Sequence, residues 1–181
     1  MQSSTHRYGR WQIGVHWLTV TLVAVAYVLI EWHGLLPKGS DARALAKTWH
    51  EMVGLSVFWL TFMRLGLRLA RPAPPIDPPL PSWQHRLARA VHALLYAWLF
   101  VMPLLGWLYL SAKGAAIPFF GFEFPALISQ DADWAGTIKS VHEFLGNAGY
   151  ALIGGHALVA LHHHYIVHDN TLARMLPARS K

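Results

Sequence analysis

The stretch GYALIGGHALVAL, residues 149–161, is apolar enough to lie in lipid, yet it carries a histidine at position 156. The next nine residues, HHHYIVHDN at positions 162–170, add four more histidines. Ionisable side chains are rare inside membrane spans, where they face the bundle interior and mark functional sites. These residues therefore predict a membrane helix that carries functional imidazoles.

The composition of the whole chain also favours a membrane protein. Of the 181 residues, 54% are hydrophobic and only 13% are charged, whereas a soluble chain carries about 25% charged residues. The chain has no cysteine, which excludes disulfides and thiolate metal sites. The net charge of +6 does not indicate nucleic-acid binding, because the basic residues flank apolar runs instead of forming one face. We expect a single domain over residues 1–181.

Four apolar stretches are each close to the roughly 20 residues needed to cross the hydrocarbon core. Pro103 lies inside the third stretch, which membrane helices tolerate with a kink. The proline-rich segment 71–81 predicts an extended connector between the second and third stretches. The sequence thus predicts an all-α integral membrane four-helix bundle. The expected spans are roughly residues 13–30, 49–69, 90–110 and 141–167.

Basic residues predict the orientation of the bundle. Ten lie in or next to the two terminal tails and the second connection, against five in the first and third connections. By the positive-inside rule, both termini are expected in the cytoplasm. The third connection, residues 111–140, is rich in Phe and Trp and is expected to form an aromatic cap on the outer membrane surface. The five outer basic residues are Lys38, Arg43, Lys47, Lys113 and Lys139.

Four histidines fall at two depths of the predicted bundle. His142 and His156 are fourteen residues apart, which corresponds to about 21 Å along a helix and about 40° in azimuth. Both therefore point to the same side of the fourth span. His50 matches the outer level of His142, and His16 matches the inner level of His156.

Two stacked imidazole pairs suit two haems that are held between helices. When both axial positions of the iron are filled, no position is left for oxygen, which suits electron transfer. Glycines near the ligands would let a flat macrocycle approach the backbone. The alternative is that the glycines serve close helix packing and the histidines form interhelical hydrogen bonds. These glycines are Gly14, Gly54, Gly146, Gly149, Gly154 and Gly155.

Several motifs make the chain similar to a known family over essentially its whole length. They are RWQIGVHW (10–17), WHEMVG (49–54), VHEFLGNAGY (141–150), GH (155–156), HHY (163–165) and DNTLARMLP (169–177). Together they resemble the bacterial cytochrome b561 family. This resemblance implies a multi-pass cytochrome of the bacterial inner membrane with two haem b groups. The implied iron ligands are His16, His50, His142 and His156.

The resemblance also implies an activity. Close members of the family act as superoxide oxidases, which pass electrons from superoxide outside to ubiquinone, with no obligatory protein partner. The alternative is a cytochrome b subunit that links a dehydrogenase or hydrogenase to the quinone pool. A haem-free metal transporter is disfavoured, because the acidic residues Glu31, Glu51 and Glu143 all lie near span ends.

Arg64 lies fourteen residues after His50, so the two share a helix face, and Arg64 is at the level of the inner haem. An arginine this far into a span needs a partner. A haem propionate is the expected partner, and snorkelling to lipid headgroups is the alternative. His92 in the third span has no assigned partner at this stage.

The histidine triplet 162–164 lies beyond the inner ligand and suggests a role in quinone reduction, which takes up two protons. Imidazole is a suitable proton donor near neutral pH. Three consecutive residues point about 100° apart, so they cannot all line one pocket. His163 shares the face of His156 most closely, His164 is the next candidate, and Asp169 is a possible inlet for protons. The alternative is that these histidines bond to headgroups and water.

The outer basic residues are expected to steer a small anion such as superoxide towards the outer haem. Lys47 and Lys139 each lie three residues before an outer ligand. Pairing with haem propionates is therefore an equal alternative use for these two lysines.

Overall fold

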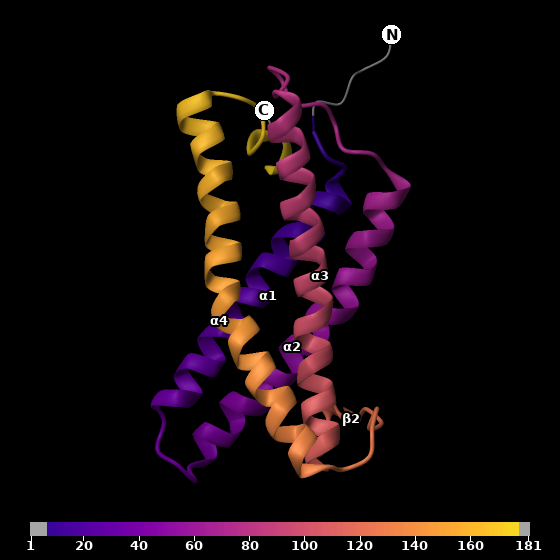
Figure 1. Cartoon of the computed structure of the whole chain (residues 1–181), viewed down its shortest axis with the longest axis vertical. Coiled ribbons are helices and arrows are strands. Elements are labelled where there is room, and N and C mark those ends of the chain that lie inside the picture. The colour runs from indigo at the N-terminus through magenta and orange to yellow at the C-terminus, as the bar shows by residue number, and fades with distance from the viewer. Residues whose placement is uncertain (1–6, 178–181) are drawn as a thin grey trace.

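A computed structural model describes residues 7–177 as four long helices, α1 (Arg10–Leu35), α2 (Asp41–Ala70), α3 (Ser82–Lys113) and α4 (Ala132–His162) (Figure 1). Each is long and apolar enough to cross a membrane. The predicted all-α membrane four-helix bundle is therefore confirmed. Helix α3 runs through Pro103 without interruption.

The helices begin earlier than the predicted apolar stretches, by up to nine residues at α4, where Ala132 precedes Val141. Polar caps set these starting points. The side chain of Ser40 accepts a hydrogen bond from the backbone of α2, and Asp131 accepts two from the first turn of α4. Such caps satisfy the free N–H groups of a helix start. At the other end of α3, Gly114 adopts a left-handed conformation (φ +67°) that closes the helix.

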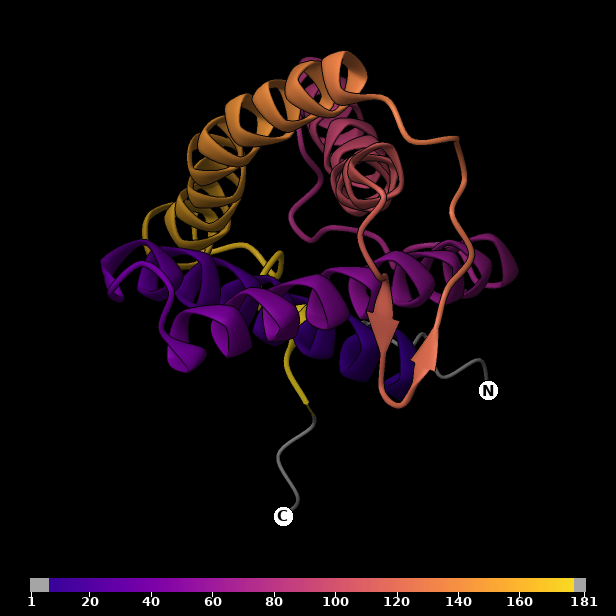
Figure 2. The same ribbon diagram turned by 90° about the horizontal axis from the view of Figure 1, so that it is seen from below.

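The bundle consists of two helix pairs. Figure 2 shows α1 and α2 as one layer and α3 and α4 as the other. The most extensive contacts are within these pairs, and α2 packs on α3 across the layers. Two aromatic side chains tie α4 to the other helices. The Tyr27 hydroxyl donates to the Gly146 carbonyl at 2.7 Å, and the Trp98 indole donates to the Leu145 carbonyl at 3.0 Å.

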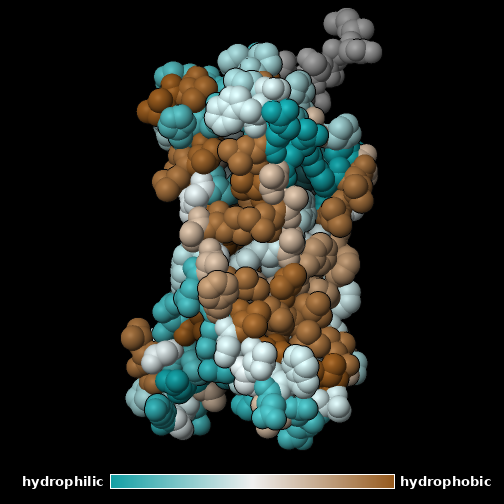
Figure 3. All heavy atoms as spheres, in the orientation of Figure 1, coloured by the Kyte–Doolittle hydropathy of each residue, from teal (hydrophilic) through white to brown (hydrophobic). Residues whose placement is uncertain are grey.

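Large apolar side chains cover the outside of the bundle. Val28 and Leu158, for example, are 65% and 68% exposed. Hydrophobic residues dominate the middle of the face in Figure 3, and hydrophilic residues gather towards both ends. Apolar patches of this extent would be a liability in water. Lipid is therefore the solvent for the middle of the bundle.

A short hairpin closes one end of the bundle. Strands β1 (Pro118–Phe119) and β2 (Phe122–Glu123) pair antiparallel. Phe124, which follows β2, stacks on Trp107 with ring centres 5.1 Å apart, and the Trp107 indole donates to the Pro125 carbonyl. The expected aromatic cap thus packs on the bundle, although Phe122 and Trp134 remain exposed.

The opposite end is closed by the chain's C-terminal segment. After α4 the chain forms a π-helix, η1 (His163–Val167), and later a 3-10 turn, η2 (Ala173–Met175). Residues 169–177 then pack against the connector segment 74–77 and Tyr8, and we call this assembly the C-terminal clasp. The Tyr8 backbone N–H donates to the Arg174 carbonyl, and the Trp17 indole donates to the Met175 carbonyl.

Candidate functional site

His50 on α2 and His142 on α4 face each other across a cavity of about 330 Å³. The two ring centres are 6.3 Å apart, and the ring planes are nearly perpendicular at 83°. All four helices contribute to the wall, so the cavity lies inside the bundle. Its other lining residues include Tyr27, Gly54, Trp98, Met102 and Gly146.

Hydrogen bonds and close packing fix these two rings. Nδ1 of His50 lies 2.8 Å from the Ala26 carbonyl, which can only accept, so Nδ1 carries the proton and Nε2 is free. Nδ1 of His142 is buried and makes no hydrogen bond to any residue from 7 to 177. A Cβ at Gly106 would be 3.5 Å from the His142 ring, so α3 packs directly behind it.

A second imidazole group lies towards the other end of the bundle. The rings of His92 and His156 meet edge to face with centres 5.3 Å apart. Nη2 of Arg64 donates to Nδ1 of His16 at 3.0 Å. His16 interacts electrostatically with Arg64, His92 and His156. The structure therefore gathers all four side chains, but the ring beside His156 is that of His92 and not that of His16.

His92 was given no partner from the sequence, yet it has the features of a site residue. Its Nδ1 donates to the Ala88 carbonyl at 2.6 Å, so in the neutral ring Nε2 carries a lone pair. The signal was present, because His92 lies near the inner start of the third predicted span, at the level assigned to His16 and His156.

A wall of packed side chains stands midway between the two histidine groups. The Tyr27 ring and the Trp98 indole are nearly parallel, at 6°, with centres 6.4 Å apart. Gly149 lies seven residues from both His142 and His156, and a Cβ there would overlap the Tyr27 hydroxyl and the Trp98 ring. Gly149 therefore serves close helix packing and not access for a cofactor. Gly54, by contrast, lines the outer cavity and has nothing within 4 Å of where its Cβ would be.

Comparison with known proteins identifies the family of the chain. A family model described as prokaryotic cytochrome b561 matches residues 7–178. Cytochrome b561 homolog 1 of Escherichia coli (strain K12) is 38% identical over 174 residues, which cover 96% of this chain and 99% of that protein. The chain belongs to the prokaryotic cytochrome b561 family. The resemblance inferred from its motifs is thereby confirmed.

Two further relatives cover this cytochrome b561 almost completely. The protein named probable superoxide oxidase CybB of Yersinia pestis is 35% identical over 173 residues, 96% of this chain and 97% of that protein. Cytochrome b561 homolog 2 of Escherichia coli (strain K12) is 32% identical over 96% of this chain and 93% of that protein. Membership makes the chain a multi-pass bacterial membrane protein of electron transfer that binds haem b.

The outer pair of this cytochrome b561 fits a haem. An iron atom bound by one ring nitrogen on each side, at about 2 Å, places the ring centres roughly 6 Å apart, and the observed separation is 6.3 Å. The bond from His50 to a backbone carbonyl is the orienting contact typical of metal-bound imidazoles. No group of three or more His, Cys, Asp or Glu side chains within the described residues could hold a bare metal ion. Two imidazoles alone suit an iron whose other ligands belong to a macrocycle.

The inner group of the cytochrome supplies the right donor types, namely three imidazoles and one guanidinium. Arg64 is half-buried, and its guanidinium is turned towards His16. Arg68, one turn further along, is exposed. The assignment of His16 and His156 as an iron pair, and of a propionate as the partner of Arg64, stays a prediction.

His163 begins the π-helix that follows α4. Its Nδ1 donates to Oδ2 of Asp169 at 2.6 Å, and the Asp169 side chain is fully buried. Burial alone would raise the pKa of Asp169, but hydrogen bonds from His163 and Thr171 hold that pKa below its usual value. His164 contacts Tyr165 instead, with ring centres 4.7 Å apart. The structure thus gives His163, and not His164, a buried carboxylate partner.

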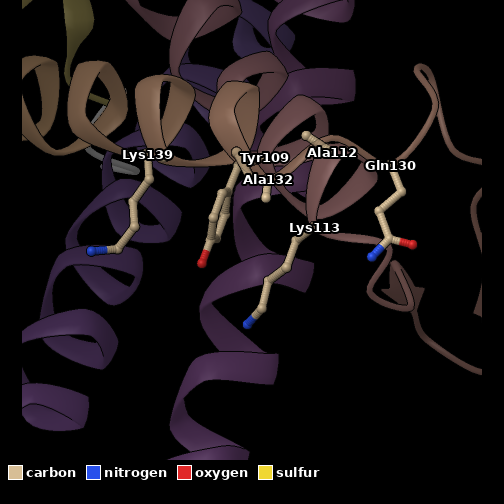
Figure 4. Close-up of a pocket in the computed structure, with 8 residues that line it drawn as sticks. Tyr109, Ala112, Lys113, Gln130, Ala132 and Lys139 are labelled. Atoms are coloured by element: carbon tan, nitrogen blue, oxygen red, sulfur yellow. The ribbon is translucent and has the colours of Figure 1, made fainter.

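The outer basic residues are less available than the sequence suggests. Lys47 pairs with Glu51 at 3.1 Å, and Lys139 pairs with Glu143 at 3.0 Å. Lys113 lies over the Tyr109 ring, with its Nζ 6.0 Å from the ring centre. A pocket of about 290 Å³ lies at the hairpin end of α3 and α4 (Figure 4). Its lining includes Tyr109, Lys113, Gln130 and Lys139.

Proposed function

We propose that this cytochrome b561 is a superoxide oxidase of the bacterial inner membrane, with both termini in the cytoplasm. It removes one electron from each of two superoxide anions at the outer face, releasing two O₂. Two electrons and two cytoplasmic protons convert ubiquinone to ubiquinol at the inner face. The observation that carries the proposal is the presence of two imidazole groups at opposite depths of one bundle, the outer pair spaced for iron.

In this proposal the chain holds two haem b groups through four histidines, in two pairs. His50 and His142 hold the outer haem, and His16 and His156 hold the inner one. When bound, the haems supply reversible one-electron chemistry across the bilayer. Arg64 contributes a fixed positive charge at the inner level, where it favours the reduced state of the site.

At the outer face, the pocket beside Lys113 and Lys139 supports a superoxide donor. Glu143 already neutralises Lys139, so Lys113 supplies the attraction for an anion in this pocket. Figure 4 shows the side chains of Lys113, Tyr109 and Lys139 pointing to the same side of the pocket. A small anion is attracted by such a surface without needing a shaped binding site. The name of the Yersinia pestis relative, probable superoxide oxidase, supports the same donor.

At the inner face, His163 is the proposed proton donor to the quinone, and His164 is a secondary candidate. His163 lies seven residues beyond His156, about two helical turns, so it is near the proposed inner haem. Its side chain is only partly exposed and is hydrogen-bonded to a carboxylate. A π-turn at this point supports a functional role, since such turns are frequent at functional sites.

The test uses purified protein with no added partner. Superoxide from an enzymatic generator should drive ubiquinol formation in the ratio of two superoxide anions to one ubiquinol, and superoxide dismutase should abolish it. His163→Ala should leave haem reduction by superoxide fast and slow quinone reduction by roughly 100-fold, the usual contribution of a positioned proton donor. If quinone is reduced only after a dehydrogenase or hydrogenase is added, the chain is instead the electron-transfer subunit of such an enzyme. Normal quinone reduction by His163→Ala would place the quinone elsewhere.

A further inference from the structure

Asp169 is a fully buried carboxylate at the inner end of the bundle, outside the spans. A buried charge is costly unless hydrogen bonds and opposite charges compensate it. Oδ2 accepts from Nδ1 of His163 at 2.6 Å, and Oδ1 accepts from the Thr171 backbone N–H at 2.7 Å. The carboxylate is therefore ionised at neutral pH, and both of its oxygens are committed.

The C-terminal clasp holds this carboxylate in place. Next to Asp169, the backbone N–H of Asn170 donates to the Asp77 carbonyl, and the Asn170 side chain accepts from the Asp77 N–H. The buried guanidinium of Arg174 donates to the Pro74 carbonyl and lies 5.6 Å from the Tyr8 ring centre. Three segments that are distant in sequence thus fix one side chain next to His163.

We propose that Asp169 is a positioning residue that orients His163 and retains its proton for quinone reduction. This inference rests on the proposed function and deepens it. Because Nδ1 of His163 is committed to Asp169, only Nε2 is left to meet a quinone oxygen. The negative charge of Asp169 stabilises the protonated ring, as a carboxylate partner does for a catalytic histidine.

The proton balance is simple. For each quinone, two electrons arrive and two protons are needed, and His163 donates one proton at a time from Nε2. Its N–H bond breaks and an O–H bond forms on the quinone, while Asp169 stays a carboxylate throughout. Water on the cytoplasmic side then reprotonates Nε2 before the second transfer.

The surroundings of the pair favour this role. The positive charge of Arg174 attracts the Asp169 carboxylate. Arg68 and Tyr8 are further electrostatic neighbours of Arg174. The His162 ring centre lies 5.9 Å from that of His163. The pKa of Asp169 is held below its usual value. Asp169 therefore stays a carboxylate at neutral pH.

The test is Asp169→Asn in the haem-loaded protein. The amide oxygen can still accept the hydrogen bond from His163, whereas the charge and the acceptor for the Thr171 N–H are lost. Quinone reduction should slow by about tenfold or more, and the pH above which the rate falls should move to a lower value. Haem content and haem reduction by superoxide should not change. Asp77→Asn is the matched control, because this exposed carboxylate lies in the same clasp without a contact to His163.

Unchanged quinone reduction and an unchanged pH profile in Asp169→Asn would overturn the inference while the proposed function stood. Absence of superoxide-driven quinone reduction in the unmodified protein would instead remove the proposed function. If Asp169→Asn does not retain haem, the pH profile of quinone reduction by His163→Gln tests the inference instead. Its side chain still donates to Asp169 but does not titrate, so the alkaline fall of the rate should disappear. A wild-type pH profile in His163→Gln would refute the proposal.

Discussion

The outer and inner histidine groups of this cytochrome b561 differ in what their rings contact. The outer pair, His50 and His142, stands apart across a cavity, with spacing that suits an iron atom. In the inner group, His16 is bonded to Arg64 and His156 is covered by His92. The difference follows from the half-buried guanidinium of Arg64, which needs a partner inside a span and finds it in an imidazole. The outer rings are thus held by helix packing and a backbone carbonyl, and the inner rings by polar side chains that contact one another.

The largest expected effect comes from removing an outer ligand. His50→Ala should lose one haem per chain and leave the other with an unchanged low-spin spectrum, because the two sites are held by different histidines. Haem content is measured against protein concentration by visible spectroscopy. His33→Ala is the control, since this histidine lies at the same end of the bundle but does not line the cavity. Two haems in His50→Ala would refute the separation into two pairs.

The next effect tests the wall between the two regions. Gly149→Ala should lower the free energy of unfolding by about 1–3 kcal/mol, the usual cost of overpacking, because the new methyl group would overlap Tyr27 and Trp98. Thermal unfolding in detergent measures this change. Gly136→Ala on the same helix is the control, because nothing lies within 4 Å of its Cβ position. Equal stability of the two variants would show that the wall is not tightly packed.

The four helices, the two histidine depths and the two lysine–glutamate pairs could be predicted from the sequence. Hydropathy located four helices, and the helical rise placed His142 and His156 at two depths on one face. The Lys47–Glu51 and Lys139–Glu143 pairs have the i,i+4 spacing of helix ion pairs, so they could also have been predicted.

Other features depend on how separate helices are rotated against one another, which depth alone does not determine. The contact of His92 with His156 and the role of Gly149 as a packing residue are of this kind. The burial of Asp169 depends on three segments that meet only in the folded chain, so composition and periodicity carry no signal for it.

A smaller effect sharpens the account of the inner group. Arg64→Gln should make the inner haem harder to reduce by roughly 40–90 mV, since a positive charge nearby is worth about 1–2 kcal/mol to the added electron. The outer haem should keep its midpoint potential. Arg68→Gln, which removes an exposed charge one turn away, should change neither potential. A potentiometric titration that shows no change in Arg64→Gln would mean that Arg64 does not act on the inner haem.

The smallest effect is expected at the outer surface, where glutamates already neutralise two lysines. Reduction of the protein by superoxide should slow only about twofold to fivefold between low salt and 0.5 M salt, because screening shortens the reach of the remaining charges. Lys113→Gln should reduce this salt dependence more than Lys47→Gln does. Stopped-flow measurement at several ionic strengths provides the comparison, and a rate that is independent of salt would exclude electrostatic steering.

In the proposed reaction, electrons enter at the outer face and protons are taken up at the inner face. Its most direct test uses sealed vesicles in which the hairpin end of the protein faces outwards and superoxide is generated only outside. Ubiquinol should form, and the internal pH should rise because two internal protons are consumed for each ubiquinol. A protonophore should abolish this pH change. Ubiquinol formation with protons taken from the outside medium, or without any superoxide dependence, would contradict the account.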